Sequence, residues 1–227
     1  MDETQIEATL DAAERAVATG TSVGQAGFWK VVGAVKGDPG LVERYADRIA
    51  RIDRAALKGW ALVIVPLWLG NMLMIGGSLI GLVLVAWAYS VEGNAAGVVF
   101  LLGFGVVLVA THSLGHLVAG ALMGIRFTHW FIGSISQPQP GVKVDYASYL
   151  RAPPASRAWM HASGALVTKI LPFALLGAAF AADVPIWTVV VLIVVGIGQV
   201  LTDVIWSTKA SDWKKFRREM GFAQSGS

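Results

Sequence analysis

Two long stretches of this sequence carry almost no charge, and they restrict the chain to folds that can lie in a membrane. Between Gly59 and Ala110 the only charged residue is Glu92. The stretch from 158 to 208 is apolar apart from His161, Lys169, Asp183 and Asp203. Over the whole chain 15% of residues are charged, whereas soluble domains average about a quarter. Stretches this long and apolar predict membrane-spanning helices.

Breaks within these stretches predict four spans, at about residues 66–91, 95–124, 158–181 and 184–207. The first apolar run, 59–91, is longer than a straight span needs, because as a helix it would extend roughly 50 Å across about 30 Å of hydrocarbon. One span preceded by an interfacial helix fits this run, and so does one tilted and kinked helix. A tight hairpin of two helices fits it less well.

The polar segments that flank the spans have patterns of their own. Residues 1–58 predict an amphipathic helical region, because apolar residues recur at helical spacing in stretches such as Ile6–Val17. Residues 126–157 predict a small β-hairpin at the membrane surface, since polar and apolar residues alternate on both sides of a turn rich in proline. Residues 209–227 form a basic tail.

Basic residues concentrate in three regions: before the first span, between the second and third spans, and after the fourth. By the positive-inside rule all three regions face the cytoplasm, so we expect an even number of spans and two cytoplasmic termini. Their position beside the spans already explains these charges, and nucleic acid is therefore not an expected partner. The acidic start, with no apolar run after it, does not resemble a secretory signal peptide.

Together these patterns predict an all-α polytopic membrane protein with the lipid bilayer as its surroundings. Its parts are a cytoplasmic amphipathic helical region at 1–58, a membrane domain at 59–208 with about four transmembrane helices, and a basic cytoplasmic tail at 209–227. A small β-hairpin lies between the second and third helices. The sequence contains no cysteine, which excludes disulfides and thiolate metal sites.

Two histidines on the second span form the clearest chemical signal in the sequence. His112 and His116 stand four residues apart, so both imidazoles lie on one face of a helix and can reach one metal ion. Two histidines can also hydrogen-bond in a bundle core without metal, but ionisable residues inside a span are costly and functional by default. A tetrahedral catalytic site needs a third protein ligand. Asp203 is the candidate, unless it is a helix-end residue exposed to headgroups.

The motif around these histidines resembles a known family. The segment His112-Ser113-Leu114-Gly115-His116, followed by Gly124-Ile125-Arg126-Phe127, is similar to the first motif of the site-2 protease family of intramembrane zinc metalloproteases, His-Glu-x-x-His. Arg157–Gly164 resembles the segment that leads into that family's Gly-Pro-x-x-Asn helix. Asp203 stands where the family has its aspartate ligand. The resemblance covers about residues 95–208 and implies Zn²⁺ bound by His112, His116 and Asp203, with a transmembrane helix as substrate or partner.

Three departures from the family pattern bear on activity. Ser113 replaces the family's catalytic glutamate, and serine cannot hold a proton reversibly near neutral pH as a general base must. The Gly-Pro-x-x-Asn segment lacks its proline and ends in Thr168, and no glycine follows Asp203. Losing a general base commonly lowers the rate about 10²–10⁴-fold. The ligand set is therefore expected to survive, while proteolysis is expected to be impaired.

Other polar residues in the spans have two interpretations each. His161 is a fourth metal ligand or base, or else an interfacial histidine; as a ligand it would close the site and make the protein a metal-holding scaffold. Lys169, deep in the third span, either extends to the cytoplasmic surface or pairs with Asp203, which would compete with metal. Thr168 can line the same polar cavity, and Asp145 of the hairpin can fold over the site.

The sequence thus predicts a membrane-embedded zinc metalloprotease-like protein that acts on or binds transmembrane segments and cleaves poorly. The alternatives are a non-catalytic scaffold that binds metal or helices, that is, a pseudoprotease, and a small transporter that uses Lys169 and Asp203.

Overall fold

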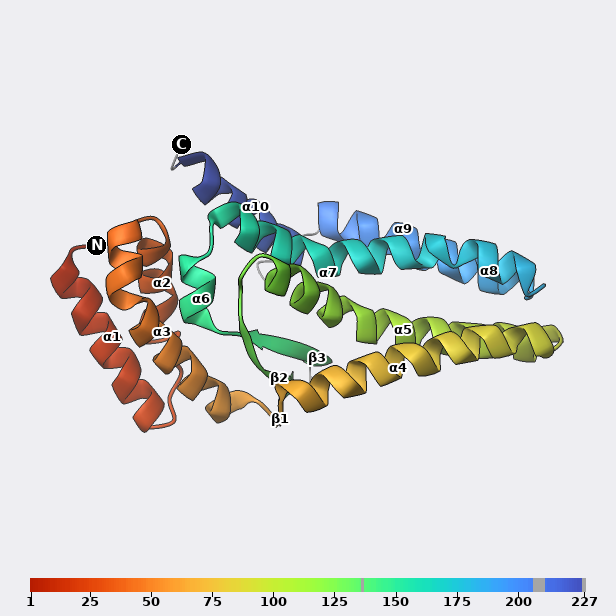
Figure 1. Ribbon diagram of the computed structural model, residues 1–227, viewed down its shortest axis with the longest axis horizontal. Helices are drawn as coiled ribbons and strands as arrows, with labels where there is room; N and C mark the ends of the chain where they lie inside the picture. The colour runs from red at the N-terminus through yellow and green to blue at the C-terminus, as the bar shows by residue number, and fades with distance from the viewer. Residues whose placement is uncertain (136, 206–210, 226–227) are drawn as a thin grey trace. The chain divides into compact units, whose positions relative to one another are not determined.

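The computed structural model describes residues 1–135, 137–205 and 211–225 (Figure 1). The chain forms two compact units. Unit 1 comprises Met1–Pro66, Gly120–Arg157 and Glu219–Ser227. Unit 2 comprises Leu67–Ala119 and Ala158–Arg218. Unit 2 carries the apolar helices, whereas unit 1 carries the polar helices and the sheet. The two units therefore divide the chain by composition as well as by contact.

Three amphipathic helices begin unit 1: α1 (Glu3–Ala18), α2 (Phe28–Lys36) and α3 (Pro39–Trp60). The carboxylate of Asp2 accepts a hydrogen bond from the backbone N–H of Gln5 and so caps α1. Asp38 caps α3 in the same way, and Pro39 occupies its first position, where a missing N–H does no harm. The apolar faces of the three helices are buried against one another, as expected for residues 1–58.

The sheet of unit 1 is antiparallel, with strand order β1-β2-β3. Strands β2 (Phe127–Ser134) and β3 (Gln137–Val144) form the predicted hairpin, followed by the short helix α6 (Tyr146–Arg151). Strand β1 (Val63–Pro66) adds to β2, with Val65 opposite Trp130. The sequence predicted the turn at residues 137–141, which is wrong, because these residues belong to β3; prolines are tolerated there since β3 is an edge strand. Ser136 lies outside the described residues.

Strand β1 overturns the prediction for the run 59–91, which placed an interfacial helix or a kinked helix there. Helix α3 ends at Trp60 and the next helix begins only at Leu67. Val63, Ile64 and Val65 are β-branched and favour the extended backbone. Pro66 has no N–H to donate, which suits the end of an edge strand. The run is therefore a strand followed by one helix.

A buried cluster of charges in unit 1 is centred on Glu219, in the C-terminal part of helix α10 (Asp212–Ser225). The Glu219 carboxylate is fully buried and accepts hydrogen bonds from Lys36, from Arg157 Nε at 2.8 Å and from Tyr149 Oη at 3.1 Å. Arg157, itself 2% exposed, also donates to the backbone carbonyls of Leu150 and Ala152. Burial alone raises the pKa of Glu219, but Lys36 and Arg157 outweigh it and hold the pKa below its ordinary value.

This cluster makes the stability of the protein sensitive to acid. In the unfolded chain Glu219 takes up its proton near pH 4.5, whereas in the folded chain it does so at lower pH. Its contribution to stability is therefore fully present above about pH 4.5 and is lost as the pH falls through the folded pKa. We expect the thermal unfolding midpoint in detergent, followed by circular dichroism, to fall more steeply with acid in the wild type than in Glu219→Gln. Parallel acid profiles for the two proteins would contradict this assignment.

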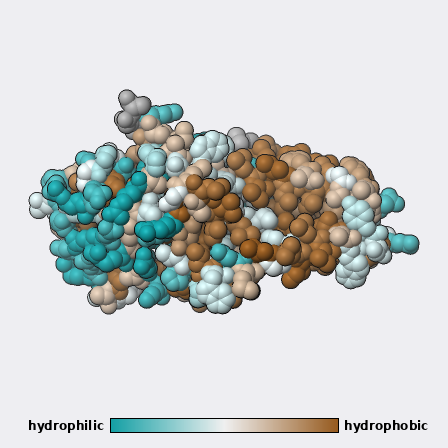
Figure 2. All heavy atoms as spheres, viewed as in Figure 1, coloured by the Kyte–Doolittle hydropathy of each residue, from teal (hydrophilic) through white to brown (hydrophobic). Residues whose placement is uncertain are grey.

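Unit 2 is built on four helices that are long and apolar enough to cross a membrane, as the sequence predicts. They span Leu67–Ser90 (α4, Leu67–Trp87, and η1, Ala88–Ser90), Gly93–Leu122 (α5), Pro154–Ala181 (α7, Pro154–Ala174, and α8, Leu176–Ala181) and Ile186–Asp203 within α9 (Ile186–Ile205). Their outward faces are hydrophobic: Trp68, Leu79 and Val83 on α4 are each about 60% exposed, and Figure 2 shows hydrophobic side chains gathered over these helices. The predicted end of the fourth span at 207 and the start of the tail at 209 lie outside the described residues.

Close packing of small residues fixes the helices of unit 2. A Cβ atom at Gly103 of α5 would lie 2.6 Å from the carbonyl oxygen of Gly81 on α4, so only glycine allows the two backbones to approach this closely. Phe100 and Phe104 of α5 pack with Leu192 of α9 in the core between the helices. The second span, which carries the histidine pair, is therefore held on more than one side.

Candidate metal centre

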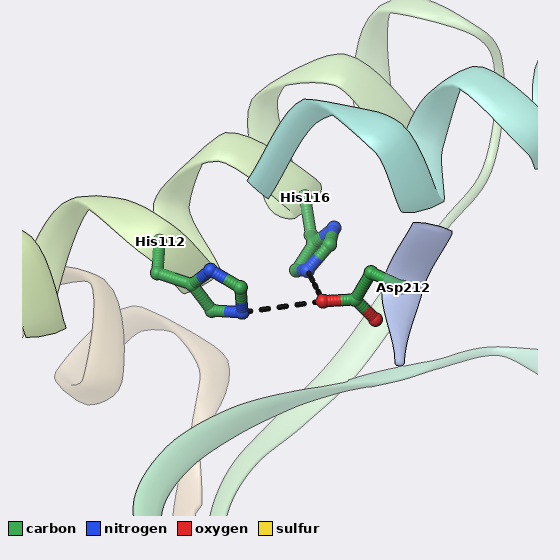
Figure 3. A group of neighbouring side chains, drawn as sticks. All are labelled: His112, His116 and Asp212. Carbon is green, nitrogen blue, oxygen red and sulfur yellow. Dashed lines mark hydrogen bonds and ion pairs between the residues drawn. The ribbon is translucent and has the colours of Figure 1, made fainter. Parts of the chain in front are cut away.

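Three potential metal ligands from two distant segments meet in unit 2. His112 and His116 lie one turn apart on α5, and Asp212 is the first residue of α10. The Oδ2 atom of Asp212 is 3.4 Å from His112 Nε2 and 3.2 Å from His116 Nε2. Figure 3 shows both imidazoles directed at this one carboxylate. One ligand atom from each residue can be chosen so that all three lie within 4.8 Å of one another.

The hydrogen bonds of His116 define a position between its ring and Asp212 that either a proton or a metal ion can occupy. Its Nδ1 lies 2.7 Å from the carbonyl oxygen of Met160, which can only accept, so Nδ1 carries a proton and donates. In the neutral imidazole Nε2 then has a lone pair, yet it faces the carboxylate of Asp212, which also only accepts. Either a second proton or a metal ion must lie between them. A histidine whose outer nitrogen donates to a backbone carbonyl is the usual arrangement of a metal-bound imidazole.

The separations suit a tetrahedral ion. With bonds of about 2.0–2.1 Å, two ligands of a tetrahedral zinc ion lie about 3.3 Å apart. Both separations that involve Asp212, 3.2 and 3.4 Å, match this value. The imidazoles of His112 and His116 have ring centroids 4.9 Å apart and are nearly perpendicular, so they do not stack on each other. The donor set of two imidazoles and one carboxylate therefore fits zinc.

Burial and charge act in opposite directions on Asp212. Burial raises the pKa of the Asp212 carboxyl, but hydrogen bonds from His112 and His116 and the nearby charge of Lys215 outweigh it and hold that pKa far below its usual range. Lys215 binds the other oxygen, Oδ1, at 2.9 Å. Asp212 is therefore ionised and presents Oδ2 to the histidines.

The position of His116 depends on a glycine in the neighbouring helix α7. A Cβ atom at Gly164 would lie 2.4 Å from His116 Nε2 and 2.8 Å from the carbonyl oxygen of His112. The two helices also meet at Gly115, where a Cβ atom would lie 3.2 Å from the Cα of Gly164. The hydroxyl of Ser163 donates to the carbonyl of Gly115 at 3.0 Å. Helix α7 thus supplies the wall of the site as well as the Met160 carbonyl.

The variant Gly164→Ala is expected to disturb the site directly. Its methyl group would occupy the space next to His116 Nε2, so the imidazole or the helices must move. We expect zinc affinity to fall at least as much as on loss of an outer-shell partner, about 10–100-fold. The matched control is Gly105→Ala on α5, the helix of the two histidines, where an added Cβ meets nothing within 4 Å. Competition titration with a chromogenic chelator measures both, and equal affinities would show that Gly164 plays no part in the site.

Asp203, the third ligand expected from the sequence, is engaged elsewhere. It forms an ion pair with Lys169 of α7, which also donates to the carbonyl of Ala165 at 3.2 Å. Lys169 thus takes the second of its two predicted arrangements, the one that competes with metal binding. The physical reason is that a lysine among apolar helices needs a counterion nearby. Among the described residues, the group that can hold a metal ion contains Asp212 and not Asp203.

The other predicted residues lie at varied distances from the histidine pair. Ser113 is buried on α5 between the two histidines, 3% exposed. The ring of His161 on α7 is half-buried, with its centroid 6.5 Å from that of His116. Thr168 donates to carbonyls of its own helix, at Gly164 and Ala165. Asp145 lies in unit 1, paired with Arg54 and Arg126.

Asp212 is the residue that the sequence analysis missed, because the acids considered were those of the spans and the hairpin and not those of the C-terminal tail. A signal was present: Asp212 is the only carboxylate residue between Asp203 and Glu219. It also starts a helix whose backbone is capped by Ser211, since Ser211 Oγ accepts from the N–H of Lys214.

Comparison with known proteins finds no matching family model, no similar curated protein and no similar solved structure.

Proposed function

We propose that this chain is a membrane-embedded zinc-binding protein that binds transmembrane segments and cleaves them poorly or not at all. The observation that carries the proposal is the convergence of His112, His116 and Asp212 around one position, with ligand atoms spaced so that they could hold a metal ion. Zinc suits two imidazoles and a carboxylate at tetrahedral spacing. The resemblance of the segment 95–208 to site-2 proteases supports the same class of site.

Membrane embedding is supported by the four apolar helices and their exposed hydrophobic faces. A water-exposed helix with Trp68, Leu79 and Val83 all on its surface would be costly, because each large apolar side chain gains about 1.5–3 kcal/mol on leaving water. The basic residues beside the helices support a cytoplasmic location for both termini. The partner class is then another transmembrane segment, since the site lies on helices surrounded by lipid.

Each residue of the site has a defined part in this function. His112, His116 and Asp212 would hold the ion, and the Met160 carbonyl orients His116 by accepting its Nδ1 proton. A zinc ion supplies Lewis acidity and lowers the pKa of bound water toward about 7. Efficient hydrolysis also needs a base that accepts a proton. Ser113 stands at that position, and its hydroxyl does not accept a proton reversibly near neutral pH.

Metal content tests the proposal. The detergent-purified wild type, prepared without chelators, is expected to hold about one zinc ion per chain by inductively coupled plasma mass spectrometry. His116→Ala is expected to lose it, and His129→Ala, which changes a histidine of strand β2, to keep it. A metal-free wild type would leave the His–Asp contacts as proton-mediated ion pairs and end the metalloprotein proposal.

Cleavage assays test the second part of the proposal. A transmembrane reporter in proteoliposomes is expected to stay intact with the wild type while it co-purifies with the protein. Cleavage that a chelator abolishes would instead show that the protein is a working protease with a base other than residue 113.

A further inference from the structure

We propose that His161 is a fourth protein ligand that closes the metal centre, giving a site of three imidazoles and one carboxylate with no position left for water. This inference rests on the proposed function, because it assumes that His112, His116 and Asp212 hold the ion. It concerns a residue outside the group of three that already meet. The relevant face of α7 is the one that lies against His116.

That face is identified by Gly164. The Cβ direction of Gly164 points at His116 Nε2, the nitrogen that faces Asp212, at a distance of 2.4 Å. His161 precedes Gly164 by three residues, and residues three apart share a face of a helix. The backbone between them is fixed, because the Met160 carbonyl accepts from both His116 Nδ1 and Ser163 Oγ. His161 therefore lies on the side of α7 from which the ion can be reached.

The ring distances support the same conclusion. Two imidazoles bound to one tetrahedral zinc ion have ring centroids about 5 Å apart, given Zn–N bonds of about 2.0–2.1 Å. His112 and His116 are at 4.9 Å, which matches. His116 and His161 are at 6.5 Å, with the rings inclined at 72°. The excess is about 1.5 Å by this comparison, so the His161 ring has to turn toward the ion position in order to bind.

The same part of α7 also contacts the helix that provides Asp212. The ring of Trp159 packs edge-on against Phe216 of α10, with centroids 5.4 Å apart. Helix α7 therefore contacts α5 through Met160 and Gly164 and contacts α10 through Trp159. His161 lies between Trp159 and Gly164 in the sequence, and its ring lies near His116 of α5.

A metal site closed by four protein ligands is consistent with a serine, rather than a general base, at position 113. Zinc sites with four protein ligands are structural, whereas catalytic sites keep a position open for water or substrate. A centre of His112, His116, His161 and Asp212 would have neither an open position nor a base at residue 113. Such a site joins α5, α7 and α10 through one ion. The ion then stabilises the arrangement of helices rather than activating water.

Cobalt substitution and an external ligand test the inference. The full chain is loaded with Co²⁺ in detergent, and its visible absorption is recorded during titration with azide, which binds cobalt only at an open or water-filled position. The wild type is expected to be unaffected by azide. His161→Ala is expected to show an azide-dependent spectrum, and His129→Ala to behave as wild type. His161→Gln, with a side chain of closer size, repeats the test if the alanine variant folds poorly.

Affinity separates a ligand from a supporting residue. Loss of an outer-shell partner weakens metal binding about 10–100-fold, and loss of His161 as a ligand is expected to exceed this range. An azide-sensitive wild type, or a His161→Ala variant with unchanged affinity, overturns the closed site but leaves the three-ligand site standing. A wild type that binds no Co²⁺ or Zn²⁺ overturns the proposed function itself, so the two failures are distinguishable.

Discussion

Replacing Asp212 by alanine is expected to remove bound zinc from the protein, whereas changing Asp203 is expected to leave the zinc content unaltered. The carboxylate of Asp212 lies 3.2 and 3.4 Å from the two histidine nitrogens that face it. That of Asp203 is neutralised by Lys169. Loss of a ligand should weaken zinc binding by more than the roughly 10–100-fold that an outer-shell change causes. Mass spectrometry and chelator competition on the purified variants measure both quantities.

The control for Asp203 has to remove charge in pairs. Asp203→Asn alone leaves Lys169 without its counterion among apolar helices, which is costly in itself. The double variant Lys169→Met/Asp203→Asn removes both charges at once and isolates the question of ligation. Retention of zinc by Asp212→Ala together with its loss from the double variant would restore the ligand set that the site-2 protease resemblance implies.

The second large effect is expected in unit 1, where Glu219→Ala should destabilise the protein by about 3–5 kcal/mol. Removing this carboxylate deletes the ion pairs that it forms with the buried Lys36 and Arg157, so Glu219 no longer offsets the burial of these two cations. Breaking a buried pair by deleting one partner is costly, because the desolvation of the remaining charge is no longer offset. The change is read as the shift in free energy of unfolding from denaturant titrations in detergent.

An exposed ion pair provides the matched comparison. Glu14 binds Arg48 at 2.9 Å through a side chain that is about half exposed, and surface pairs contribute only about 0–1 kcal/mol. Glu14→Ala should therefore have little effect. If Glu219→Ala cost no more than Glu14→Ala, the burial of the Lys36–Glu219–Arg157 cluster would not matter for stability.

Much of the fold follows from composition and periodicity. The absence of charge from Gly59 to Ala110, apart from Glu92, is enough to predict the first two apolar helices. Alternation from Arg126 to Ile132 is enough to predict strand β2, but the proline-rich segment 137–141 was wrongly predicted as the turn, because it belongs to strand β3. Strand β1 was hidden, because Val63–Pro66 lies inside an apolar run whose hydropathy does not distinguish a buried helix from a strand.

The sequence was enough to predict the two histidines of the site but not its carboxylate. The i, i+4 spacing of His112 and His116 is a local property of one helix, so it can be read directly. The choice between Asp203 and Asp212 depends on which carboxylate Lys169 neutralises, and that is decided by the packing of α7 against α9. Spacing along the chain contains no information on such a contact. The role of Gly164 is equally tertiary, since it follows from the approach of α7 to His116.

Because Asp212 begins α10, the carboxylate and the two histidines are held by helical segments that differ in how readily they open. The histidines sit within the long helix α5, whereas the first turn of a helix is the part that opens most readily. Release of that turn would withdraw the carboxylate and leave both imidazoles in place. We therefore expect exchange of a bound ion to follow the opening of one helical turn rather than separation of the apolar helices, so that loading and release need no disassembly of the bundle.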